Sequence, residues 1–77
     1  MGLYDLDMRE RKLVASTISA CFRSKGCRKV PTYKDEFVEV YLGLGINDSL
    51  DSMLVSRGID VNYTPQEAYE LYDDVMR

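Results

Sequence analysis

Residues 64–77 read TPQEAYELYDDVMR, and this stretch decides the fold more clearly than any other part of the chain. Thr64 is a favoured helix N-cap, Pro65 suits the first helical position, and the Glu67 carboxylate can bond back to the cap. Apolar side chains then recur at helical spacing, at Ala68, Leu71, Tyr72 and Val75. The stretch therefore predicts a helix that runs to the C-terminus.

A second capping pair, Asp7 and Glu10, predicts the start of another helix near the N-terminus. Gly26 is a natural stop for that helix. Between the two, apolar residues recur at helical spacing, at Val14, Ile18, Cys21 and Phe22. We therefore expect a first helix from about residue 7 to residue 25.

The middle of the chain gives weaker signals. Pro31 discourages Val30 from helical geometry, and Thr32 is the expected cap of a second helix, with Asp35 at its third position. The apolar positions follow helical spacing, at Phe37, Val40, Tyr41 and Leu44. Residues 37–42 are also rich in β-branched and aromatic side chains, so a strand is the alternative to the favoured helix.

Gly43 and Gly45 end this element and predict a turn. Three candidate caps follow the turn, Asn47, Asp48 and Ser49. A short third helix through residues 50–54 should then end at Gly58. Together these signals predict one all-α domain over residues 1–77, a bundle of three or four short helices in which the C-terminal helix packs across a hairpin made by the earlier ones.

A chain of 77 residues has a modest core, which alone supplies about 3–5 kcal/mol of stability. No stretch reaches the roughly 20 apolar residues of a membrane helix, and Met1 leads into Asp5 and Asp7 without the apolar core of a signal peptide. We expect no membrane partner and a cytoplasmic location.

The charges divide the chain into two regions. Between Glu10 and Asp35 every charged side chain is basic: Arg11, Lys12, Arg23, Lys25, Arg28, Lys29 and Lys34. From Glu39 onward acidic side chains dominate: Glu39, Asp48, Asp51, Asp60, Glu67, Glu70, Asp73 and Asp74. Such a pattern carries information about binding partners rather than about fold.

Catalytic and metal chemistry find little support in the sequence. The chain has no histidine and two cysteines, Cys21 and Cys27, which do not make a zinc-binding pattern. No glycine-rich phosphate loop and no nucleophile with an identifiable base are present. We expect neither enzymatic activity, nor a metal, nor a cofactor. Cys21 is expected in the core and Cys27 in a loop, where neighbouring cations would favour a reactive thiolate as the alternative.

The favoured function is recognition of another protein. Six tyrosines exceed what one small core absorbs, and tyrosine suits interfaces. The predicted site lies on the C-terminal helix and comprises Glu67, Tyr69, Glu70, Tyr72, Asp73, Asp74 and Met76. Its expected partner is a protein with a basic groove, including a nucleic-acid-binding protein. Small modules of this type are often regulators or inhibitors, including phage-encoded ones.

Nucleic-acid binding is the alternative function. Its predicted site is the basic segment 23–34, with Arg23, Lys25, Arg28, Lys29 and Lys34 on phosphates and Tyr33 stacked on an unpaired base. The charge separation also allows a homodimer, with the positive segment of one copy against the negative helix of the other.

Residues 37–54 resemble a helix-turn-helix with Gly45 at the turn. However, Tyr41 stands where a small residue lets the two helices approach, and Asp51 occupies an apolar position of the second helix. Asp48 and Asp51 would also repel the phosphate backbone from the recognition helix. A plain helical hairpin is therefore the favoured interpretation.

The motif Asp48-Ser49-Leu50-Asp51 resembles the Asp-Ser-Leu attachment signature of acyl carrier proteins, and residues 37–39 and 44–45 are similar to that family upstream. The resemblance implies that Ser49 carries a phosphopantetheine arm. The chain departs from the family at Gly58, which ends the helix after Ser49 early. An N-cap role explains Asp48 and Ser49 equally well.

Overall fold

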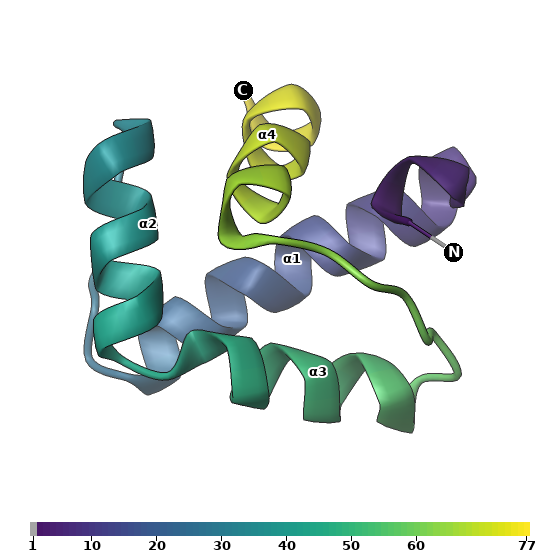
Figure 1. The fold of residues 1–77 in the computed structure, drawn as a ribbon, viewed down its shortest axis with the longest axis horizontal. Helices are drawn as coiled ribbons and strands as arrows, with labels where there is room; N and C mark the ends of the chain where they lie inside the picture. Colours follow the sequence, from purple (N-terminus) through teal and green to yellow (C-terminus); the bar gives the residue numbers. More distant parts are fainter. Residues whose placement is uncertain (1) are drawn as a thin grey trace.

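The computed structural model describes residues 2–77, and these residues form a bundle of four α-helices. The elements are a 3-10 turn η1 (Leu3–Asp5) and the helices α1 (Met8–Ser24), α2 (Lys34–Gly43), α3 (Ile46–Ser56) and α4 (Pro65–Met76). In Figure 1, α1 lies behind the other helices, α2 and α3 form an L, and α4 lies within its angle. α4 packs against α1 and α2. The predicted all-α bundle is confirmed.

The two helices with the clearest caps begin where the sequence predicts. The Glu10 amide donates to Asp7 Oδ1 at 2.8 Å, and the Glu67 amide donates to Thr64 Oγ1 at 3.1 Å. Each acid bonds back to the amide of its cap residue, which completes two capping boxes. Each cap stabilises its helix by about 1 kcal/mol. These contacts are local, so neighbouring residues suffice to predict them.

The predicted cap of α2 is wrong. The N-cap residue is Tyr33 rather than Thr32, and no side chain caps this helix. Thr32 instead accepts hydrogen bonds at its carbonyl from Tyr69 and Arg77 of the C-terminal segment. These tertiary contacts fix the backbone before α2, and the helix therefore starts one residue later than a Thr32 cap implies.

The predicted cap of α3 is also wrong. The helix begins at Ile46 after Gly45, which has φ +67° in the left-handed region, where glycine carries no Cβ penalty. Asn47, Asp48 and Ser49 therefore lie in the first turn of α3. Asn47 accepts a hydrogen bond at Oδ1 from the buried Tyr41 hydroxyl at 2.9 Å. The predicted turn at Gly45 is confirmed.

Aromatic packing holds α2 in helical form, so residues 37–42 are a helix and not a strand. Phe37 is fully buried, with its ring centroid 5.1 Å from that of Phe22 on α1 and 5.3 Å from that of Tyr69 on α4. Tyr41 is also buried and stacks on Phe37 at 5.8 Å. Phe37 thus joins three helices, and the burial of its ring outweighs the β propensity of the segment.

Cys21 belongs to this core, as the sequence predicts, and its thiol lies 3.5 Å from the Met53 sulfur. Burial raises the pKa of the Cys21 thiol, which keeps it in the unreactive protonated form. In residues 2–77 no helix has the length and apolar character that a membrane span requires.

Candidate functional site

The two tyrosines of the predicted α4 site lie largely inside the molecule. The Tyr69 hydroxyl donates to the Thr32 carbonyl at 2.9 Å, and its ring meets Phe37 edge-on. Tyr72 is only 9% exposed. Both side chains therefore help to pack α4 against α2, and little of either is available to a partner.

Several acids of α4 also have partners within the chain. Glu67 is used in the capping box, Glu70 pairs with Lys34 at 3.2 Å, and Asp73 pairs with Arg77 at 3.2 Å. Among residues 2–77, Asp74 has neither a hydrogen bond nor an ion pair from its side chain, and Met76 is 49% exposed. Asp74 and Met76 are therefore the members of the predicted site that remain most open to a partner.

Arg77 has a role that the sequence interpretation missed. Its guanidinium donates to the carbonyls of Thr32 at 3.0 Å and Pro31 at 3.1 Å, and it lies 5.4 Å from the centre of the Tyr72 ring. Its position four residues after Asp73, at the negative end of the helix dipole, was the available signal. The C-terminal turn thus ties the chain segment 31–34 to α4.

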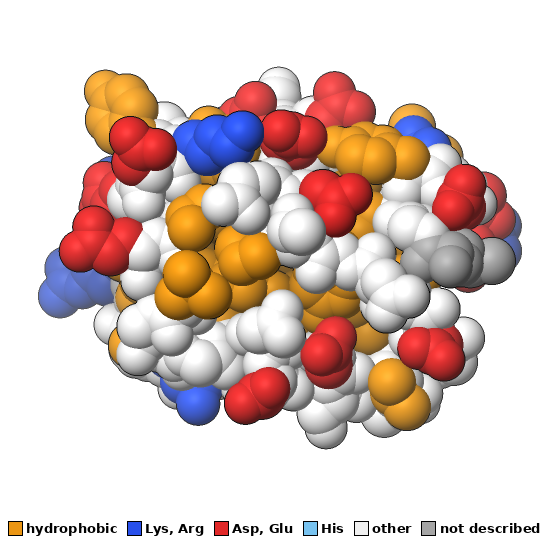
Figure 2. Space-filling view, viewed as in Figure 1, with side chains coloured by type: hydrophobic (Ala, Val, Ile, Leu, Met, Phe, Trp, Pro, Cys, Tyr) orange, Lys and Arg blue, Asp and Glu red, His pale blue; other side chains and the backbone are white. Residues whose placement is uncertain are grey.

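Acidic side chains gather around an apolar hollow on the side of the molecule formed by α2, α3 and α4 (Figure 2). We call the exposed carboxylates of these helices and of the α3–α4 connection the acidic surface. It comprises Asp35, Glu36, Glu39, Asp48, Asp51, Asp60, Glu70, Asp73 and Asp74. Within residues 2–77, only Glu70 and Asp73 of this set form ion pairs. Most of its negative charge is therefore uncompensated.

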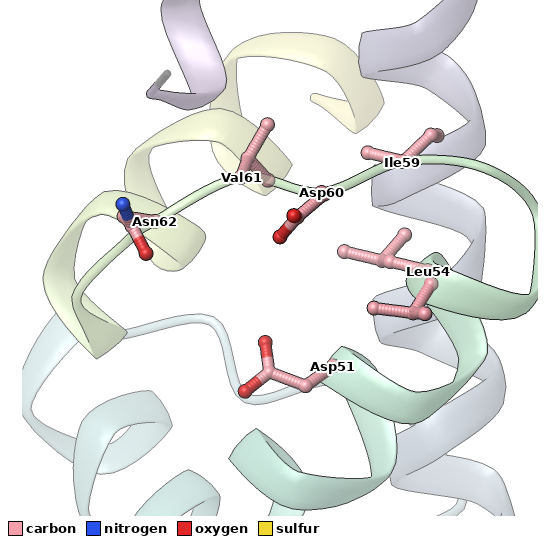
Figure 3. A pocket seen from close by; sticks show the side chains of 7 residues that line it. Asp51, Leu54, Ile59, Asp60, Val61 and Asn62 are labelled. Atoms are coloured by element: carbon pink, nitrogen blue, oxygen red, sulfur yellow. The ribbon is translucent and has the colours of Figure 1, made fainter.

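A cavity of about 230 Å³ lies between α3 and the connection that leads to α4 (Figure 3). Leu54, Ile59 and Val61 line it together with Asp51 and Asp60, and Figure 3 shows both carboxylates directed into the space. The cavity therefore combines an apolar wall with negative charge.

The Tyr63 hydroxyl holds one of these carboxylates in place by donating to Asp51 Oδ1 at 2.6 Å. Burial, and then the hydrogen bond to Asp51, raise the pKa of Tyr63 well above its usual value. Tyr63 therefore remains a donor at neutral pH and fixes the orientation of the Asp51 side chain.

The basic segment 23–34 divides into two parts. Arg23, Lys25, Arg28 and Lys29 are exposed and form no ion pair within residues 2–77. Lys34, in contrast, is directed to Glu70 on α4. Four of the five cations that were predicted to contact phosphates thus have no ion pair in the described part of the chain.

Tyr33 is 74% exposed, as base stacking would require. It borders a second cavity of about 310 Å³, whose lining includes Cys27, Val30, Pro31 and Val40. Cys27 is half-buried there, and both cysteines are free thiols. The reactivity of Cys27 stays a prediction.

Ser49, the residue implied by the carrier-protein resemblance, lies half-buried in the first turn of α3. Among residues 2–77 no group of three or more metal-ligating side chains comes together. The chain matches no protein-family model, and no curated protein or solved structure matches it.

Proposed function

We propose that this chain is a non-catalytic protein-binding module that docks on a basic partner protein through its acidic surface. The observation that supports this most strongly is the set of carboxylates around an apolar hollow, of which only Glu70 and Asp73 are paired within residues 2–77. Unpaired like charges repel one another and lower the stability of the compact state. A basic partner would relieve this repulsion, and the hollow would supply apolar burial.

The residues of the predicted α4 site have two different roles in the proposed binding. Asp74 and Met76 contribute charge and apolar contact at one border of the acidic surface, whereas Glu70 is paired with Lys34. Tyr69 and Tyr72 support the surface from inside by holding α4 against α2. Replacement of either tyrosine would therefore weaken binding through the fold rather than through a lost contact.

The expected partner has a basic groove, and a basic groove is typical of nucleic-acid-binding proteins. An acidic surface docked in such a groove would compete with nucleic acid for it. The chain would then act as a stoichiometric regulator or inhibitor, in keeping with small phage-encoded proteins as a class. We place this activity in the cytoplasm, where free thiols such as Cys21 and Cys27 persist.

Quantitative affinity capture with two charge-matched variants tests the proposal. Glu39→Gln/Asp60→Asn removes two negative charges from the acidic surface. Ser16→Lys/Ala20→Lys raises the net charge by the same amount at two exposed positions of α1. A partner captured by the wild type should bind the first variant with about fivefold lower affinity. This factor corresponds to about 1 kcal/mol of lost electrostatic attraction. A partner that keeps its affinity for the first variant and loses it for the second would contradict the proposal.

A further inference from the structure

The outward side of α1 carries a row of residues that the acidic surface does not use. Arg9, Lys12, Ser16, Ala20 and Arg23 are all exposed, and their spacing of three or four residues places them along one side of the helix. Figure 1 shows α1 behind α2, α3 and α4, where it crosses the angle between α2 and α3. The row therefore faces away from most of the acidic surface.

The basic residues continue from α1 into the following loop. Gly26 has φ +95°, and the Cys27 amide donates to the Phe22 carbonyl at 3.0 Å, so the chain turns back sharply where α1 ends. This turn keeps the loop cations next to the C-terminal end of α1. We call the combined set the basic face: Arg9, Lys12, Arg23, Lys25, Arg28 and Lys29.

The charges of the basic face are not neutralised within the described chain. In residues 2–77 the ion pairs join Lys34 to Glu70 and Arg77 to Asp73, and neither pair includes a member of the basic face. The nearest acids along the sequence, Asp7 and Glu10, are bonded to backbone amides in the α1 capping box. Six exposed cations therefore remain for an external anion.

We propose that the basic face binds the phosphate backbone of double-stranded nucleic acid. Lys12 and Arg23 lie eleven residues apart on α1, which corresponds to about 16 Å along the helix axis. The major groove of B-form DNA is about 12 Å wide and admits a helix. The cations at the two ends of α1 thus reach phosphates on both sides of the groove.

The middle of the row suits close approach to a duplex. Ser16 and Ala20 are the exposed residues between the two cationic ends, and both side chains are small. They leave the helix free to settle near the groove without a bulky or acidic side chain in the way. They also offer few groups for reading base edges, so the binding is directed to phosphates rather than to a sequence.

The net charge of −3 does not prevent this binding. The molecule measures 26 × 23 × 18 Å, whereas charges at physiological salt are screened over about 8 Å. Carboxylates on the opposite side of the bundle are therefore largely screened from a duplex at α1. At very low salt their repulsion grows, but so does the attraction of the nearer cations.

A fluorescence-anisotropy titration with a labelled 16-base-pair duplex tests the proposal. Six phosphate contacts predict an affinity loss of about a thousandfold between 50 and 200 mM salt. Arg28→Gln/Lys29→Gln and Lys12→Gln/Arg23→Gln should each weaken binding at least tenfold at 50 mM salt. Arg57→Gln, which removes an exposed cation outside the basic face, is the control and should change affinity less than twofold.

Circular dichroism of each variant checks that the fold is kept. No duplex binding by the wild type at 50 mM salt would overturn the proposal, and so would equal losses in the Arg57 variant and the basic-face variants. Tighter binding of a single strand that depends on Tyr33 would overturn the assignment to a duplex. Heparin that competes no better than unlabelled duplex at equal charge would support the duplex assignment, and preferential competition by heparin would overturn it.

Discussion

Residues 8–33 and residues 34–77 use their charged side chains in opposite ways. The first region, α1 and its loop, contains seven basic residues and one acidic residue, whereas the second contains three basic and ten acidic residues. In the second region Lys34 and Arg77 bind acids of α4. In the first, Arg11 donates to the Tyr4 carbonyl, and the cations of the basic face have no ion pair within residues 2–77.

The two regions therefore offer opposite charges to partners, and the second region also uses Lys34, Glu70, Asp73 and Arg77 within the fold. The C-terminal segment is joined to the distant segment 31–34 through Tyr69, Glu70 and Arg77. Substitutions there should change the free energy of unfolding. Substitutions of arginine or lysine on the basic face should change binding and leave stability nearly unaltered, because surface positions without such contacts contribute little.

The largest effect is expected where the two regions meet, at Phe37. Its ring contacts Phe22 of the first region and Tyr69 of the second. Phe37→Ala should therefore lower the free energy of unfolding by about 3–5 kcal/mol. Urea unfolding followed by circular dichroism measures this loss. Leu42→Ala, at a 61% exposed position on the same helix, is the control, and an equal loss there would show that Phe37 does not join the regions as described.

Alkaline pH should destabilise the fold through Tyr41 and Tyr63 of the second region, because the structure holds both hydroxyls in the protonated form. Burial raises the pKa of Tyr41, and burial and the bond to Asp51 raise that of Tyr63. A raised folded pKa gives stability that is complete below the unfolded pKa of about 10 and is lost as pH rises. The loss should be at most about 1.4 kcal/mol per pH unit for each tyrosine.

Urea unfolding at pH 8, 10 and 11, with phenolate absorbance recorded in parallel, checks this expectation. Tyr63→Phe should make stability less sensitive to pH, because it removes one of the two hydroxyls of the second region whose pKa the fold raises. Equal pH dependence in the wild type and the Tyr63 variant would contradict the assigned role of Tyr63.

A smaller effect is expected from the hydroxyl that joins α4 to the segment before α2. Tyr69→Phe removes the 2.9 Å hydrogen bond to the Thr32 carbonyl and keeps the ring against Phe37. The cost should be about 0.5–1.5 kcal/mol. Tyr33→Phe is the matched control at an exposed position and should cost close to nothing; a comparable loss in both variants would argue against a stabilising role for this bond.

The smallest stability effect should come from the Lys34–Glu70 ion pair, whose side chains are 46% and 50% exposed. Glu70→Gln should cost about 0.2–1 kcal/mol, and 1 M salt should remove most of the difference. Arg28→Gln on the basic face should leave stability unchanged. A salt-insensitive loss in the Glu70 variant would mean that the side chain acts through packing rather than charge.

The parts of the fold that the sequence predicts are those set by neighbouring residues. The capping boxes at Asp7 and Thr64 connect residues three apart, so the starts of α1 and α4 follow from local rules. Tertiary contacts set the start of α2, since the Thr32 carbonyl accepts hydrogen bonds from Tyr69 on α4 and from Arg77 after it, far along the chain. Gly45, in the left-handed conformation, sets the start of α3. The sequence prediction favours the polar residues that follow it as caps and therefore places the start too late.

The surfaces were harder to predict than the helices. The sequence reveals the basic segment 23–34, but Arg9 and Lys12 join it only through the length and orientation of α1. Tyr69 and Glu70 are residue types that suit an interface. The structure shows that both instead contact the distant segment 31–34, through the Thr32 carbonyl and the Lys34 ammonium group. The separation of basic and acidic residues along the sequence thus predicts binding partners. The fold determines which of these charges remain unpaired and able to bind them.

The most direct test of the division between the two regions is an NMR titration of ¹⁵N-labelled protein with the 16-base-pair duplex. We predict that the shifted amides lie within residues 9–29, along α1 and its loop, while the amides of α3 and α4 keep their positions. Shifts centred on α3 and α4, or spread evenly over the four helices, would contradict the assignment of duplex binding to the basic face alone.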